Sequence, residues 1–291
     1  MARKSPSPFR GAGAALRVRV LQDAGTPAHG SWYDRFAARY DVLFHGVWNR
    51  PREATAFLRT ALRRHHGVQE VLDVACGTFS LDLGLVRSGY AVVGRDLSPA
   101  MVRATRRALR DSGLRADVAV GDMRDLRLGK TFDAVLCLGT AFNSLVSARD
   151  VGAALRTFHR HLRPGGILIL VVANFAAWVD HPKNARAEVD RRLADGSRVA
   201  VFGFNEQDRT KSVHFARILT VVHRGSQLTV HVAQAPLRIW RRRALESTLR
   251  RTGFTPVECW GDLRPGVPFR SRSSPRLVIV ATRRESSGTP G

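Results

Sequence analysis

The sequence predicts an α/β protein with a doubly wound, mostly parallel β-sheet and a small antiparallel β insertion. Two observations carry this prediction. Between residues 68 and 184, short apolar runs alternate with amphipathic stretches of ten or more residues, which is the pattern of βαβ units. Between residues 185 and 240, strand-like runs follow one another with only polar turns between them, which indicates an antiparallel meander.

Composition sets outer limits on the class of protein. The chain has 291 residues, 44% apolar content and a formal charge of +23, with arginine far more frequent than lysine. We interpret the arginines mainly as solvated helix faces, and a surface that binds nucleic acid or another anion is the alternative. No apolar run is long enough to span a bilayer. The three cysteines form no CxxC pair, so we expect a reduced, cytoplasmic protein without a structural metal. We also expect a monomer or homodimer.

The N-terminal part of the chain divides into two segments. Residues 1–30 are basic and rich in Ser, Pro and Gly, and we expect a disordered tail. Residues 31–67 predict a helical lid, with Pro51 at a helix start and Gly67 after a helix end. An aromatic stripe at helical spacing either faces the core or closes over a ligand; it consists of Tyr33, Phe36, Tyr40 and Phe44.

The core region, residues 68–184, begins with a buried strand that enters a turn of small residues. Val71, Leu72 and Val74 form the strand, and Asp73 ends it in an apolar setting. Ala75 and the two residues after it leave room for a ligand near the backbone. A following helix would direct free N–H groups at an anionic group of that ligand.

Acidic residues also stand at the ends of the next two predicted strands. Asp96 ends the second strand, where a carboxylate can accept hydrogen bonds from both hydroxyls of a ribose. Asp122 ends the third, where it can accept from an exocyclic amine while Met123 lies against an adenine face. Because the carboxyl ends of parallel strands share one edge of the sheet, these residues together predict a nucleotide-type site.

The chain ends with residues 241–284, which predict a helix and two strands that form a hairpin on the sheet edge. The last seven residues, 285–291, are expected to be disordered.

Five segments carry a resemblance to a known family: VLDVACGT, VVGRDLSPAM, VGDMRDL, FDAVLCLGTAFNSL and LRPGG. In their residues and in their order along the chain, these segments resemble the class I S-adenosylmethionine-dependent methyltransferases. The chain is most similar to the small-molecule N-methyltransferases, including glycine N-methyltransferase and bacterial amino-sugar N-methyltransferases. The resemblance implies a Rossmann-like, seven-stranded sheet with an antiparallel last strand, and an insertion at 185–240 that covers the acceptor.

The resemblance also implies which residues bind S-adenosylmethionine. The expected contacts come from the lid, from the strand ends and from the far wall of the cleft. They are Tyr33, Arg52, Asp73, Ala75, Gly77, Asp96, Leu97, Asp122, Met123, Leu138 and Gly139.

Three positions depart from the family pattern. Phe79 replaces the last glycine of the usual GTG turn, so its ring either hinders the cofactor or points into a helix interface. Arg95 replaces a small apolar residue before Asp96. Ala173 stands where glycine N-methyltransferase carries the arginine that holds the substrate carboxylate, which argues against glycine as substrate.

Methyl transfer from a sulfonium is an in-line displacement, and it needs no strong base when the acceptor is a neutral amine. We therefore predict methylation of a nitrogen, with oxygen second. Tyr33, Tyr40 and Asn143 are the catalytic candidates. The acceptor-site candidates are Thr140, Asn143, His214 and His231. A methyltransferase of RNA or protein and a catalytically inactive binding protein remain the alternatives.

Overall fold

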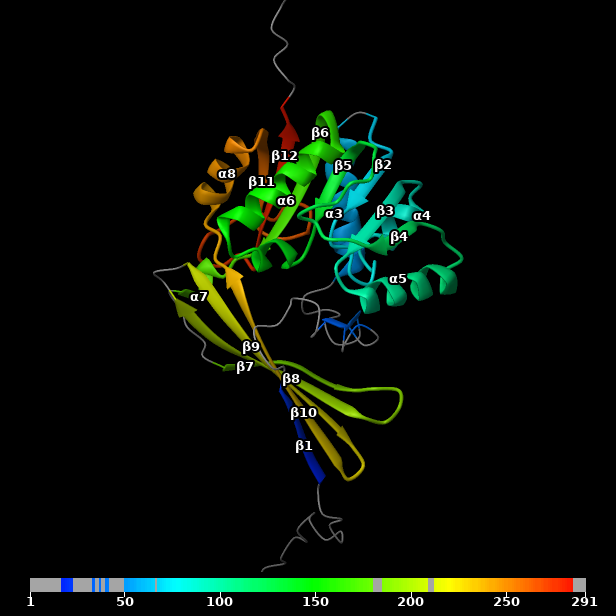
Figure 1. The fold of residues 1–291 in the computed structure, drawn as a ribbon, viewed down its shortest axis with the longest axis vertical. Coiled ribbons are helices and arrows are strands. Elements are labelled where there is room, and N and C mark those ends of the chain that lie inside the picture. The colour runs from blue at the N-terminus through cyan, green and yellow to red at the C-terminus, as the bar shows by residue number, and fades with distance from the viewer. Residues whose placement is uncertain are drawn as a thin grey trace, which may run out of the picture.

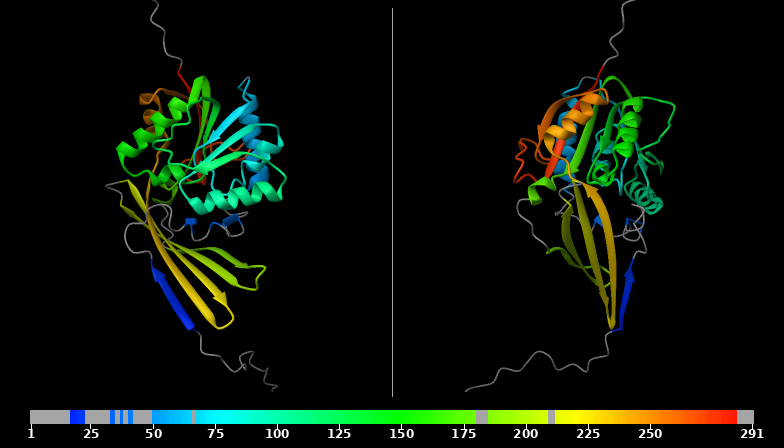
Figure 2. Two further views of the ribbon diagram at one scale, coloured as in Figure 1. Left: turned by 45° about the vertical axis from the view of Figure 1, so that its right-hand side comes forward. Right: turned by 60° about the vertical axis from the view of Figure 1, so that its left-hand side comes forward.

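The computed structural model describes residues 17–22, 33–34, 37, 40–41, 50–65, 67–179, 185–208 and 212–284. An α/β core holds one sheet, and a second sheet extends away from one end of that core (Figures 1 and 2). Among the helices of these residues, none has the length and apolar character that a membrane crossing requires.

The core sheet has seven strands and is mostly parallel, as the sequence predicts. Its strands pair in parallel except around the last strand of the chain, which lies antiparallel to both of its neighbours. From edge to edge the order is β11 (Phe254–Trp260), β12 (Arg276–Arg283), β6 (Leu162–Ala173), β5 (Phe132–Cys137), β2 (Glu70–Asp73), β3 (Ala91–Asp96) and β4 (Asp117–Val120).

Helices cover both faces of this sheet because each has one apolar face to bury. One apolar cluster joins the sheet to α3 (Pro51–Arg63), α4 (Leu83–Arg87) and α5 (Pro99–Asp111). A second cluster, on the opposite face, joins it to α6 (Ala148–His161) and α8 (Arg242–Arg251). The sheet is therefore doubly wound, and its parallel strands direct their carboxyl ends to the edge nearest the second sheet (Figure 1).

Helix α3 corrects part of the predicted lid. Residues 31–67 were expected to cover the site, but α3 packs on the core sheet and fully buries Leu58 and Leu62. The reason is its apolar spacing, which places Ala54, Phe57, Leu58 and Leu62 on one face. Only the described residues before α3, from Tyr33 to Asp41, lie over the strand ends.

Helix α4 is shorter than the sequence predicts. It begins only at Leu83, and the residues between Gly77 and Asp82 form tight turns instead. The amide of Phe79 donates to the Cys76 carbonyl at 2.8 Å, and the amide of Asp82 donates to the Phe79 carbonyl at 3.1 Å. The expected helix N-terminus facing a ligand is therefore absent from this turn, because its amides are used locally.

The second sheet confirms the antiparallel insertion. Its meander consists of β7 (Ala185–Arg192), β8 (Arg198–Asp208), β9 (Val213–Arg224) and β10 (Gln227–Arg238). Two short elements lie at the core edge that meets it, η2 (Ala141–Ser144) and α7 (Ala176–Val179).

A fifth strand of this sheet comes from the N-terminus. Residues 1–30 were predicted to be disordered, but Arg17–Gln22 form β1, which pairs in parallel with β10. The correction has a physical reason: the outer edge of β10 offers unpaired backbone groups, and Val18 and Val20 give β1 strand-forming character. The rest of that segment and residues 285–291 lie outside the described residues.

Candidate active site

The turn after β2 places Phe79 in the core and not in the cleft. Phe79 is fully buried among the residues of α3, α4 and the sheet. Its backbone has φ of 65°, the left-handed conformation that a glycine would adopt at this position. Of the two orientations that the sequence left open, the structure has the ring in the helix interface. Phe79 therefore keeps the backbone path of a glycine turn and leaves the cleft side open.

Asp96 links two of the strand-end turns. Its Oδ2 atom accepts a hydrogen bond from the Gly77 amide at 2.8 Å, and its Oδ1 atom accepts from the Ser98 amide at 2.9 Å. Burial raises the pKa of Asp96, while both amide hydrogen bonds oppose that rise. Each carboxylate oxygen retains a second acceptor site, so Asp96 can still receive two hydroxyl groups.

Asp122 is held by Arg124, two residues further along the chain. The Arg124 guanidinium donates to both carboxylate oxygens of Asp122, with its Nε atom at 2.9 Å from Oδ2. Burial tends to raise the pKa of Asp122, but the hydrogen bonds from Arg124 outweigh it and lower the pKa. Asp122 is thus a fixed carboxylate at the end of β4, and Met123 beside it packs on the core.

Asp73 has a second buried acid beside it. Asp73 and Asp82 are each only 1% exposed, and their side chains are hydrogen-bonded to each other. Asp73 also accepts a hydrogen bond from the Ala75 amide at 2.8 Å. Burial, together with the second carboxyl group, raises the pKa of Asp82, and burial raises the pKa of Asp73 to about 7.

The described residues from Tyr33 to Asp41 are fastened to three separate strand-end turns. Asp34 accepts hydrogen bonds from the Ser98 hydroxyl and, at 3.2 Å, from the Ala100 amide, both after β3. Asp41 accepts from the Thr78 hydroxyl at 2.7 Å, after β2. Tyr33 is hydrogen-bonded to the Thr140 side chain, after β5. This segment, which we call the N-terminal strap, therefore crosses the edge where the sheet would receive a ligand.

Tyr33 and Tyr40 of the strap also contact the insertion. Their rings lie 6.0 Å apart, and both pack on the apolar cluster formed by Val189, Val199 and Val201. Burial raises the pKa of both hydroxyls, and nearby Asp96 adds to the effect. Near neutral pH these tyrosines can donate hydrogen bonds but cannot act as bases. Phe36 and Phe44 of the predicted stripe lie outside the described residues.

Asn143 is a structural residue and not a catalytic candidate. It is fully buried, and its amide nitrogen donates to the carbonyls of Arg238 at 2.9 Å and Ala173 at 3.4 Å. Its amide oxygen accepts from the Ala173 amide at 2.9 Å. Asn143 thus joins η2 to β6 and β10, and its polar atoms are directed at backbone and not at an acceptor. The prediction that Asn143 binds substrate is wrong for that reason.

The two candidate histidines lie in different places. His214 is fully buried at the core end of β9, with its ring stacked on Phe175 at a centroid distance of 4.3 Å. His231 lies in the middle of β10, opposite Leu21 of β1. His231 lies seven positions before Arg238 in β10, or roughly 23 Å along the strand. The structure therefore keeps His214 near the strand ends and separates His231 from them.

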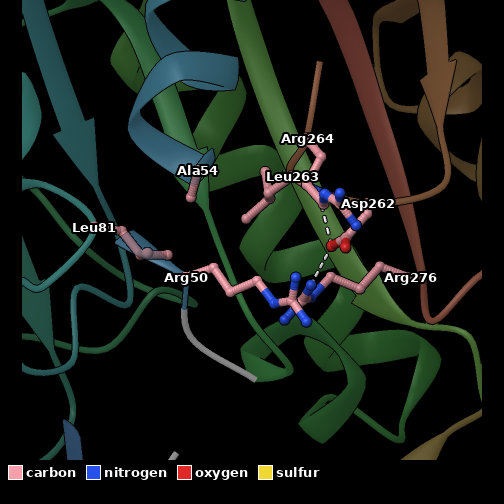
Figure 3. Close-up of a pocket in the computed structure, with 7 residues that line it drawn as sticks. All are labelled: Arg50, Ala54, Leu81, Asp262, Leu263, Arg264 and Arg276. Atoms are coloured by element: carbon pink, nitrogen blue, oxygen red, sulfur yellow. Dashed lines mark hydrogen bonds and ion pairs between the residues drawn. The ribbon is translucent and has the colours of Figure 1, made fainter. Parts of the chain in front are cut away.

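Arg52 is also displaced from the site. It is exposed on the first turn of α3, whereas Arg50, two residues earlier, lines a pocket with Arg276 and Asp262 (Figure 3). Asp262 accepts a hydrogen bond from the Arg276 guanidinium. Arg50 directly precedes α3 and its side chain lines this pocket, whereas Arg52 is exposed. The contact of Arg52 with the cofactor stays a prediction. Arg50 stands four residues before buried Ala54, a spacing that could have identified it.

The remaining predicted contacts line the same edge of the sheet. Gly77 and Gly139 have left-handed φ angles, and an added Cβ would meet no atom within 4 Å at either one. Leu97 is 46% exposed and presents an apolar surface to solvent, whereas Leu138 is 6% exposed and buried. Ala75, two residues before Gly77, is partly buried. These positions surround space that side chains leave open.

Several residues that shape this edge carry no motif of their own. Asp34, Asp41, Thr78 and Ser98 are positioned by contacts far apart in the sequence. Arg95, the departure before Asp96, is explained by its bidentate ion pair with Asp117, with Nη2 at 2.8 Å from Oδ2.

Comparisons with known proteins agree with this geometry. A family model described as a methyltransferase domain matches residues 71–166. A glycine/sarcosine N-methyltransferase of Parasynechococcus marenigrum (strain WH8102) is 38% identical over 146 residues, covering 50% of this chain and 51% of that protein. The dTDP-3-amino-3,4,6-trideoxy-alpha-D-glucopyranose N,N-dimethyltransferase of Streptomyces venezuelae is 36% identical over 216 residues, covering 69% and 89%.

One solved structure extends the agreement to the fold. CalS10 bound to SAM, an amino pentose methyltransferase from Micromonospora echinaspora, is 25% identical with a TM-score of 0.66, covering 84% of this chain and 96% of that chain. The chain spans about half the length of the first two curated relatives that it matches.

Proposed function

Because the chain belongs to the S-adenosylmethionine-dependent methyltransferases, we propose that it transfers a methyl group from this cofactor to a nitrogen of a small molecule. The observation that carries the proposal is the position of Asp96, which joins the turns after β2 and β3 beneath the N-terminal strap. Relatives that methylate glycine, sarcosine and amino sugars support a nitrogen on a small acceptor.

The residues at the strand ends fit the cofactor. Gly77 and Gly139 leave open space, and Asp96 keeps acceptor sites for a ribose. Asp122, fixed by Arg124, can accept from an adenine amine beside Met123. Leu97 and Leu138 supply apolar walls on either side. We assign these residues, with Ala75, to cofactor binding.

The pocket in Figure 3 fits the one anionic group of the cofactor, its carboxylate. Arg50, Arg264 and Arg276 contribute three positive charges, while Glu53 and Asp262 contribute two negative ones. The guanidinium groups of Arg50 and Arg276 point into the same pocket, and like charges favour an anion between them. Arg50 therefore takes the place that the sequence gave to Arg52.

When bound, S-adenosylmethionine supplies a methyl carbon on a sulfonium sulfur, which an amine lone pair attacks in line. The chain itself must hold the acceptor opposite the methyl and keep water out. The strap and the insertion exclude water, because Tyr33 and Tyr40 of the strap pack on the insertion and beside Ala100 and Met101 of α5. Tyr33, Tyr40 and Thr140 can orient the acceptor by hydrogen bonds. We assign the receipt of an acceptor proton to His214, at the core end of β9.

The acceptor is proposed to be an amine other than glycine. Ala173 ends β6 as a buried apolar residue and offers no charge to a substrate carboxylate. A cytoplasmic location and a monomeric or dimeric state remain predictions from the sequence.

A screen for release of S-adenosylhomocysteine tests the proposal. The purified chain is incubated with cofactor and with small amines, nucleotide-linked amino sugars, hydroxylated metabolites, RNA or protein. We expect release with an amine, together with a product heavier by one or two methyl groups. Release with RNA or protein alone would replace the small-molecule proposal. Cofactor binding without any turnover across the screen would favour a binding protein.

A further inference from the structure

Two carboxyl groups are buried together beneath the turn that follows β2. Asp73 ends the strand and Asp82 immediately precedes α4, and each is only 1% exposed. Their side chains are hydrogen-bonded to each other. The Oδ1 atom of Asp82 is buried, and no backbone or side-chain donor among the described residues serves it. We call these two residues the carboxyl pair.

Such a pair must hold a proton. Two ionised carboxylates have only acceptor atoms, so a hydrogen bond between them requires that one be protonated. The Ala75 amide donates to Asp73 at 2.8 Å, which favours the charge on Asp73 and the proton on Asp82. At pH 8 the pair therefore carries one negative charge and not two.

The surroundings of the pair are acidic. Asp96, which acts electrostatically on Asp73, lies across the turn, and the strap brings Asp34 close to Asp96. The Cys76 thiol faces the same groups, and burial together with these acids keeps it protonated. None of the ion pairs found in the described part of the chain gives Asp73 or Asp82 a cation. A positive charge on a ligand is thus the missing counterpart of the pair.

We propose that Asp82 is a positioning residue: by sharing its proton with Asp73, it sets the negative charge that the turn presents to the sulfonium of the cofactor. This inference rests on the proposed function, which assigns Ala75 and Gly77 of this turn to cofactor binding, and we place the methionine end of the cofactor at these two residues. It gives the turn a means of preferring the charged cofactor over the uncharged thioether product.

The preference for S-adenosylmethionine should depend on pH, because the carboxyl pair can take up a second proton on Asp73. Burial raises the pKa of Asp73 to about 7, so the pair gains a proton and loses its charge as the pH falls from 8 to 6. S-adenosylmethionine and S-adenosylhomocysteine carry the same amino and carboxylate groups and differ in the sulfonium charge. The ratio of their affinities therefore isolates the interaction that the pair provides.

The test is calorimetric binding of both compounds to the full chain at pH 8 and pH 6. For the unsubstituted protein, we expect the preference for S-adenosylmethionine to fall about tenfold between pH 8 and pH 6, as expected for one charge at short range. Asp82→Leu removes the donor to Asp73, so the pKa of Asp73 should rise further and its negative charge should be lost at a higher pH. At pH 8 this variant should prefer S-adenosylmethionine several-fold less than the unsubstituted protein does, and Asp82→Asn, which keeps a donor, should restore the preference. Asp111→Asn, an equal charge change at the exposed end of α5, should behave like the unsubstituted protein.

A second measurement needs no substitution. Binding heats of the unsubstituted protein at pH 7, taken in two buffers of different ionisation enthalpy, give the number of protons released. We expect greater proton release with S-adenosylmethionine than with S-adenosylhomocysteine. Equal release, or a folded Asp82→Leu variant with the same preference for S-adenosylmethionine at pH 8 as the unsubstituted protein, would overturn the inference. Failure of the unsubstituted protein to bind S-adenosylmethionine at pH 8 would instead refute the proposed function.

Discussion

The ring of Phe79 lies against Gly94 in the neighbouring strand β3. A Cβ atom built on Gly94 would stand 2.8 Å from the Phe79 ring and 2.9 Å from the sulfur of Cys76. Because Gly94 has no side chain, the ring of Phe79 can pack directly against β3. This arrangement explains how a phenylalanine replaces a glycine in the turn without closing the cleft.

Gly94→Ala should destabilise the protein by about 1–3 kcal/mol, because the added methyl overpacks a filled interior. Thermal or denaturant unfolding measures the loss. Gly152→Ala on α6 is the matched control, since its Cβ would meet mainly the flexible end of Arg156; it should be neutral or stabilising by roughly 0.5–1 kcal/mol. Combining Gly94→Ala with Phe79→Leu should recover part of the loss. Equal stability of Gly94→Ala and the unsubstituted protein would contradict the packing described.

Arg50 and Arg52 give a direct choice between the structural and the sequence assignments. Arg50→Ala should weaken binding of S-adenosylmethionine by about 10- to 100-fold, because the variant loses a charge-assisted hydrogen bond to the carboxylate of the cofactor. Arg52→Ala removes an exposed charge and should change the affinity by less than about twofold. Calorimetry of the two variants decides the matter. A larger loss with Arg52→Ala would restore the assignment made from the sequence.

The hydrogen bond between Tyr33 and Thr140 should hold the strap closed. Tyr33→Phe and Thr140→Val are each expected to lower kcat/KM, with a coupling free energy of about 0.5–1.5 kcal/mol in the double variant. Steady-state kinetics with an acceptor from the screen give the cycle. Thr60→Val, on the exposed face of α3, serves as control for the loss of a hydroxyl. Strict additivity of the two changes would show that the bond does not contribute to turnover.

The carboxyl pair should also make stability depend on pH. The folded-state pKa of Asp73 and of Asp82 is raised above the unfolded value, so the unfolded chain loses these protons first as the pH rises. The contribution of the pair to the free energy of unfolding therefore falls as the pH rises from about 4 to about 7. Asp82→Asn removes one of these groups, so its stability relative to the unsubstituted protein should increase with pH. Urea unfolding at pH 5 and pH 8 tests this, and an equal difference at the two values would contradict it.

Much of the fold was predictable because strand and helix periodicities are local. The apolar runs before Asp73 and Asp96 place both acids at strand ends, and parallel strands bring their ends together whatever the loops do. Local periodicity also predicted the antiparallel insertion, because its strand-like runs are joined by short polar turns. It did not find β1, because the strand-forming character of six residues is a weak signal, and the β10 edge that stabilises this strand is distant in the sequence.

The site was less predictable because its details depend on contacts far apart in sequence. Asn143 resembles a catalytic amide in the sequence, yet its partners are backbone atoms of Ala173 and Arg238, which only the fold brings near. His214 and His231 both lie in the insertion, but the register of β9 and β10 separates them. Arg50 differs, since helical spacing from Ala54 would have indicated it.

The most direct test of the site is the binding of S-adenosylmethionine to Asp96→Ala. The account predicts that the unsubstituted protein binds one equivalent of cofactor by calorimetry, and that the variant binds at least about tenfold more weakly, because hydrogen bonds to a charged acceptor are lost. Asp111→Ala, at the exposed end of α5, should bind as the unsubstituted protein does. Undiminished affinity in a folded Asp96→Ala variant would contradict the placement of the cofactor at these strand ends.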